Sequence, residues 1–123
     1  MLPKKNRITK TLEFDALFGA KFKQAGGQSF STDAFVFKIL PNKTKVNRFG
    51  FIVGTKVDNR ASVRNKVKRH LRAIFHKQLN NVDVGYDFLV VAAKPSAKLE
   101  FVEVEKQCLD FLTKMRVLKP NKI

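Results

Sequence analysis

Residues 60–75, RASVRNKVKRHLRAIF, combine two patterns that together limit how this chain can fold. Six of the sixteen positions are Arg or Lys, and none is Asp or Glu. Apolar side chains recur in the same segment at spacings of four, four, three and one, which is the period of one helix face. The segment is therefore expected to form a helix from about residue 61 to residue 79 that buries one face, made of Val63, Val67, Leu71, Ile74 and Phe75.

The cations of this segment follow the helical period as well. Arg64, Lys68 and Arg72 repeat every four residues and stack along one side of the helix, with Asn65 and Arg69 beside them. No acidic residue occurs between positions 59 and 82, so no ion pair within the helix relieves the repulsion. Like charges at this spacing destabilise a helix by roughly 0.2–0.5 kcal/mol per pair. Phosphates about one helical turn apart would remove that cost, because a guanidinium can donate two hydrogen bonds to one phosphate.

The charge of the whole chain also favours a polyanionic partner. There are 25 Lys and Arg against 10 Asp and Glu, which gives a net charge of +15. The excess positive charges repel one another in the compact state, and nucleic acid is the polyanion that most often offsets this repulsion. A solvated charged face is the ordinary explanation of a charge run, and a basic amphipathic helix can also lie on anionic lipid. The absence of acidic residues argues against a merely solvated face. Binding to lipid would require the apolar face of the helix to be exposed, whereas the protein needs that face for its core.

Length and composition limit the class of protein further. One cysteine excludes an intrachain disulfide and fits a reducing compartment. No run approaches the ~20 apolar residues that span a bilayer, and no secretory signal is recognisable. We therefore expect a cytoplasmic protein without a membrane span. The 123 residues suit one domain, with a basic arm at residues 1–8 and a flexible tail at residues 117–123.

The remaining patterns predict the fold class. A short helix is expected at residues 9–18, and strands are expected at residues 30–40 and 48–56, which should be antiparallel neighbours. An apolar run at residues 86–93 has strand length, and helical spacing returns at residues 101–115. The order α-β-β-α-β-α predicts an α+β protein, an α/β sandwich in which helices pack on a single, mainly antiparallel sheet.

The residue types that commonly carry out hydrolysis are not grouped in this sequence. His70 and His76 fall on different faces of the basic helix, and Cys108 lies in the apolar stripe of the last helix, where core packing explains it. Asp87 and Lys94 are spaced as in some metal nucleases, but the acid which that pattern requires is replaced by Ala92. The sequence therefore predicts neither catalytic residues nor a metal site on the protein.

The run Arg64-Asn65-Lys66-Val67-Lys68-Arg69, followed by Arg72, resembles the R-N-x-x-K-R-x-x-R signature of the bacterial ribonuclease P protein component. Residues 6–18, 48–56 and 87–94 resemble other segments of that family in the same order. The resemblance implies a subunit that joins a catalytic RNA and precursor tRNA, with no protein oligomer required. The RNA would remove the 5′ leader using Mg²⁺ that it mainly holds itself. The family fold also implies a left-handed βαβ crossover through the signature helix.

The resemblance also implies which residues meet which partner. Phe14 and Phe18 match aromatic residues of the opening helix that border the leader-binding cleft, and Phe35 and Phe37 are candidates for its strand side. The RNA-binding positions implied are Lys56, Arg60, Arg64, Asn65, Lys66, Lys68, Arg69 and Arg72. A small basic RNA-binding structural protein, such as a ribosomal component, is the alternative function. It would not distinguish leader-bearing tRNA from mature tRNA.

Overall fold

The computed structural model describes residue 6 and residues 26–118, so the helix predicted at residues 9–18 lies outside the described part. The described chain follows the expected alternation of strands and helices, with one extra strand at its start. In chain order the elements are β1 (Gln28–Ser31), β2 (Phe35–Pro41), β3 (Arg48–Ile52), α3 (Ala61–Gln78), η2 (Leu79–Asn81), β4 (Tyr86–Ala92), η3 (Lys94–Lys98) and α4 (Phe101–Lys114). No helix in these residues is both long and apolar enough to cross a bilayer.

The four strands form one sheet in the order β1-β2-β4-β3. The β1–β2 and β2–β4 pairs are antiparallel, whereas β3 and β4 are parallel. The mainly antiparallel sheet is thus confirmed, but the expectation that β3 pairs with β2 is wrong. β4 lies between them, and its consecutive residues Phe88, Leu89 and Val90 are all fully buried, as is typical of a central strand.

The strand predicted at residues 30–40 is divided by a tight turn into β1 and β2. The Thr32 hydroxyl accepts hydrogen bonds from the backbone N–H groups of Ala34 and Phe35, at 3.3 and 3.1 Å. It also donates to Gln107 Oε1 of α4 at 2.6 Å. The turn therefore reverses the chain and ties the β1–β2 hairpin to the last helix.

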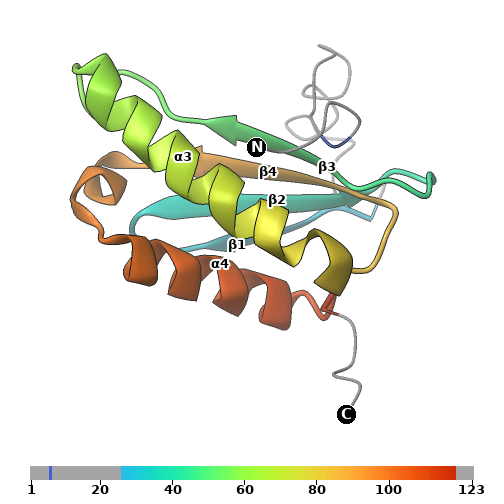
Figure 1. Cartoon of the computed structure of the whole chain (residues 1–123). Coiled ribbons are helices and arrows are strands. Elements are labelled where there is room, and N and C mark those ends of the chain that lie inside the picture. The colour runs from blue at the N-terminus through green and yellow to red at the C-terminus, as the bar shows by residue number, and fades with distance from the viewer. Residues whose placement is uncertain (1–5, 7–25, 119–123) are drawn as a thin grey trace.

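The connection from β3 through α3 to β4 has the less common hand. Figure 1 shows β3 and β4 pointing the same way, with α3 on the near face of the sheet. With both strands turned to point upward and α3 toward the viewer, β4 lies to the left of β3. The crossover is therefore left-handed, against the strong general preference for right-handed connections. The expectation drawn from the family resemblance is confirmed.

Both long helices lie on the same face of the sheet (Figure 1), and the core fills the space between. Phe37 of β2 stacks on Phe111 of α4 with ring centroids 4.7 Å apart. Phe49 of β3 stacks on Phe88 of β4 at 4.9 Å and also contacts Phe75 of α3 at 5.3 Å. These rings fix α3 against the sheet by its apolar face, so its charged faces point away from the core.

On the opposite face of the sheet, an ion pair joins the parallel strands. Arg48 Nε and Nη2 of β3 donate to the two carboxylate oxygens of Asp87 in β4, each at 2.7 Å. Asn42 Nδ2 donates to the same carboxylate at 2.9 Å. Asp87 is only 3% exposed. Its carboxylate is therefore used to hold the edge strand in place.

The last two described residues, Val117 and Leu118, are part of the folded chain. Val117 is buried, and its carbonyl accepts a hydrogen bond from Asp83 N at 2.7 Å. Leu118 forms an antiparallel bridge with Val82. The predicted start of a flexible tail at residue 117 is wrong, because these two residues cover the end of the core beside η2.

Candidate nucleic-acid interface

The cations of α3 lie on the part of the helix surface that faces neither the sheet nor α4. The buried face consists of Val67, Leu71, Ile74 and Phe75. The side toward α4 is marked by two contacts, the Lys77–Glu105 ion pair at 3.6 Å and the packing of His70 on Phe101. At 100° per residue, the remaining arc carries four of the signature residues, which are Asn65, Lys68, Arg69 and Arg72. Arg64 falls between Leu71 and Phe75 in angle, and it lies in the first turns of the helix.

Most of these cations have no acidic partner. Among the described residues, no carboxylate lies within 4.0 Å of the side-chain nitrogens of Lys68, Arg69 or Arg72, nor of Lys66. Arg69 and Lys66 are exposed, and Lys68 and Arg72 are half-buried beside the helix. The uncompensated row of charges predicted from the sequence is therefore present on the folded surface.

Two arginines shape the loop that leads into α3. Arg60 pairs with Asp58 through Nε and Nη2, at 3.0 and 3.1 Å. These hydrogen bonds, with one from Arg60 N, lower the pKa of the Asp58 carboxyl to about 2. Arg64 Nη1 donates to the backbone carbonyls of Asp58 and Asn59, at 3.0 and 2.8 Å. Arg64 thus has a structural contact that its sequence position did not reveal, and part of its guanidinium stays available for a partner.

The N-terminus of α3 adds positive potential next to this loop. No acidic residue lies in its first turn, and no side chain caps it. The first amide N–H groups of a helix lack partners within the helix, and with the helix dipole they favour an anion. An open hollow of about 490 Å³ lies beside them, lined by Thr55, Lys56, Val57, Asp58, Asn59, Arg60 and Lys94. Three cations and one acid around a helix N-terminus form a surface suited to phosphate.

Lys94 belongs to this surface although the sequence did not nominate it. β3 and β4 are parallel, so their carboxyl ends meet at one edge of the sheet, where α3 also begins. Lys94 follows β4 there and lines the hollow with Lys56 and Arg60. Knowing that the strands are parallel would have identified it. We call the whole set the basic surface: Lys56, Arg60, Arg64, Asn65, Lys66, Lys68, Arg69, Arg72 and Lys94.

Two of the aromatic residues assigned to a leader-binding cleft are instead in the core. Phe35 and Phe37 are each 0% exposed and pack with the helices on the near face of the sheet. A ring without exposed surface cannot stack on a nucleotide base, so this assignment is wrong for both residues. The alternation of side chains along β2 correctly separated the residues of its two faces, but it could not show which face of the sheet the helices cover. Phe14 and Phe18 lie outside the described residues.

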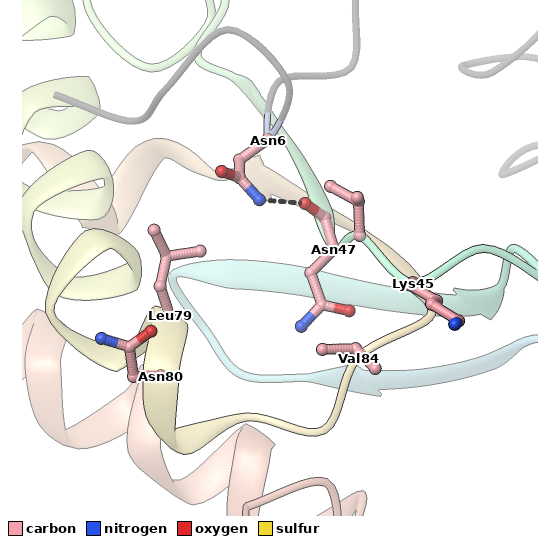
Figure 2. A pocket seen from close by; sticks show the side chains of 7 residues that line it. Asn6, Lys45, Asn47, Leu79, Asn80 and Val84 are labelled. Carbon is pink, nitrogen blue, oxygen red and sulfur yellow. Dashed lines mark hydrogen bonds between the residues drawn. The ribbon is translucent and has the colours of Figure 1, made fainter.

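A second pocket lies at the opposite end of α3 (Figure 2). It has a volume of about 300 Å³ and is lined by Asn6, Lys45, Val46, Asn47, Leu79, Asn80 and Val84. Asn47 Nδ2 donates to Asp83 O at 2.8 Å, and Asn47 Oδ1 accepts from Tyr86 N at 2.9 Å. The backbone carbonyl of Asn47 accepts from Asn6 Nδ2 at 2.7 Å (Figure 2). Asn47 is thus fully engaged in joining segments of the chain, so we assign it a structural role.

Cys108 and His70 are both packed against other side chains. Burial raises the pKa of the Cys108 thiol, which is therefore protonated at neutral pH and unreactive. Burial, with the charges of Lys66 and Arg69, lowers the pKa of His70. No three acidic, histidine or cysteine side chains in the described part of the chain are grouped to hold a metal ion.

Comparisons of sequence and of structure point to one family. The Ribonuclease P family model matches residues 2–116. A ribonuclease P protein component from Listeria monocytogenes is 33% identical over 123 residues, covering 98% of each chain. The RNase P protein of Staphylococcus aureus superposes with a TM-score of 0.77 at 26% identity, over 94% of this chain and 100% of that one. That of Thermotoga maritima gives a TM-score of 0.73 at 27% identity, over 88% and 96%.

Proposed function

Because this chain belongs to the bacterial ribonuclease P protein family, we propose that its basic surface binds the catalytic RNA subunit of that ribonucleoprotein. The chain is the protein component of an endoribonuclease that processes the 5′ ends of tRNA. What we add is the assignment of that RNA contact to α3 and to the loop before it.

One observation carries this assignment. The outward arc of α3 bears cations that no carboxylate of the described residues neutralises. These cations lead to the N-terminus of the helix, which no side chain caps. RNA supplies phosphates at a spacing close to one helical turn, so several of these side chains can be neutralised together. Each neutralised phosphate releases condensed counterions, which makes the binding strongly dependent on salt.

We further propose that the bond is broken by the RNA, with Mg²⁺ held mainly by the RNA as well. The protein contributes charge and position. Two carboxylates support this division of roles, because Asp87 is engaged by Arg48 and Asp58 by Arg60 instead of facing a metal ion. A cationic surface beside the RNA lowers the repulsion between phosphates, and the need for Mg²⁺ to screen that repulsion falls with it. The site of action is the cytoplasm.

The second partner in this proposal is precursor tRNA, with its 5′ leader contacting Phe14 and Phe18. The family resemblance supports these two residues. The leader would pass close to the basic surface, because the RNA that cuts it is bound there. Contacts to phosphate and to base faces tolerate any sequence, as a subunit that serves many different leaders requires.

Reconstitution with a bacterial ribonuclease P RNA tests the proposal. We expect the protein alone to leave precursor tRNA intact and to accelerate its cleavage by the RNA at low Mg²⁺. Arg69→Ala should weaken binding to the RNA about tenfold, the usual scale for a charge-assisted hydrogen bond, and should raise the Mg²⁺ requirement.

Lys106→Ala is the matched control, since it removes the same charge from an exposed position on α4 that neighbours acidic residues. It should behave like the wild-type protein. Cleavage by the protein without RNA, or equal effects of the two substitutions, would contradict the proposal.

A further inference from the structure

Two neighbouring apolar side chains are exposed at the start of α4. Phe101 is 39% exposed and Val102 is 69% exposed. Single exposed apolar residues are common on protein surfaces and need no special explanation. Phe101 differs because its aromatic ring is partly exposed while a contact with another helix holds it in place.

The ring of Phe101 is held from one side by α3. The His70 ring meets it edge-on, with centroids 5.2 Å apart and planes at 87°. This contact fixes the ring at the junction of the two long helices and leaves part of it exposed. A partly exposed aromatic ring that is held in place is the feature that proteins use to stack unpaired bases.

The charges around Phe101 are mainly positive. Lys66 precedes His70 by one helical turn on α3, and Arg69 precedes it by one residue; both are exposed. Lys98, also exposed, ends η3 three residues before Phe101. Two acids, Glu100 and Glu103, lie at this end of α4, and Glu105 is engaged by Lys77 at 3.6 Å. A partner that offers both a flat apolar surface and negative charge fits this arrangement best.

We propose that Phe101 is a stacking platform for an unpaired base of RNA, with Lys66, Arg69 and Lys98 binding the phosphates on either side. The inference rests on the proposed function and extends it. The RNA interface continues from the signature face of α3 across the helix to the N-terminus of α4. A protein partner would have to bring its own acidic groups to the same place, whereas RNA carries a phosphate at every nucleotide.

The chain contains no tryptophan, which allows a direct test in the full-length protein. Phe101→Trp creates one fluorophore at the platform, and Val102→Trp creates a matched one beside it. Titration with a bacterial ribonuclease P RNA should strongly quench the emission of Trp at position 101 and quench that at position 102 much less. Unchanged emission at position 101 at saturating RNA would overturn the platform and leave these side chains to a protein partner.

Affinities separate stacking from simple apolar contact. Phe101→Ala and Phe101→Leu should each weaken RNA binding about tenfold without changing its salt dependence. Phe101→Tyr, which keeps a stacking face, should retain the affinity, and Val102→Ala should not affect it. Thermal unfolding of each variant identifies any loss that comes from misfolding. If Arg69→Ala weakens binding while all Phe101 variants match the wild type, the platform fails but the proposed function stands. If neither site matters, both fail.

Discussion

Arg64 serves two purposes through one guanidinium group. Nη1 donates to two backbone carbonyls of the loop before α3, and no hydrogen bond within the described residues uses the other two nitrogens. Lys56 and Arg60 lie on or beside that loop. Arg64 therefore acts on RNA binding both through its charge and by fixing where two further cations lie.

Arg64→Ala and Arg69→Ala should consequently differ. We expect Arg64→Ala to lower the free energy of unfolding by about 1 kcal/mol, because it removes two hydrogen bonds to the loop, and to weaken RNA binding as well. Arg69→Ala should weaken RNA binding alone. Urea unfolding and RNA titration of the two variants check this, and equal stabilities would show that the loop does not depend on Arg64.

His70 should give the stability of the protein a component that depends on pH. Burial lowers its pKa from the ordinary value of 6.5, and the charges of Lys66 and Arg69 act in the same direction, against Glu100. The unfolded chain then binds the proton more readily than the folded one. This contribution is fully present above pH 6.5 and is lost as the pH falls toward the lowered pKa.

His70→Gln, which cannot titrate, should therefore flatten the dependence of the unfolding free energy on pH below 6.5. Urea midpoints measured from pH 7.5 to pH 5 provide the test. An identical slope in wild type and variant would mean that His70 is not the group responsible.

Among the helices and strands, those with a regular pattern of apolar residues were the ones that the sequence predicted well. The helices α3 and α4 and the strand β4 appear within about one residue of their expected limits, because each has an uninterrupted apolar pattern. β1 was not predicted as a separate strand, since its residues QSFS are mostly exposed and only Thr32 marks the turn that ends it.

Strand pairing was not predictable in the same way. Nothing local in Arg48–Ile52 indicates that its neighbour is β4, because the choice is made by the crossover through α3. The cations of α3 were found because they share one helix and one period. Lys94 was missed because only the parallel pairing brings it to them.

The Arg48–Asp87 pair should hold the edge strand to the sheet. Asp87→Asn removes the charge of a nearly buried carboxylate that Arg48 and Asn42 engage, and removing one member of a buried ion pair typically costs about 3 kcal/mol or more. We expect that loss in urea unfolding, together with nearly normal cleavage when the variant is folded and saturates the RNA. Loss of the cleavage step itself at saturation would assign Asp87 to the chemistry and refute its structural role.

At the scale of the molecule, charge is distributed unevenly. The cations of α3 and of the hollow at its N-terminus lie toward one side, whereas acidic residues gather around Lys106, where α4 meets the β1–β2 turn. These acids are Asp33, Glu103 and Asp110. Such an asymmetric field orients a protein as it approaches a polyanion, so RNA should meet the basic surface first.

The salt dependence of binding to the catalytic RNA tests the central claim most directly. Each phosphate contact adds about 0.7–0.9 to the slope of log affinity against log salt concentration. The triple variant Lys68→Ala, Arg69→Ala, Arg72→Ala should therefore reduce that slope by about two to three, while Lys106→Ala leaves it unchanged. An unaltered slope in the triple variant would mean that the cationic face of α3 does not neutralise RNA phosphates.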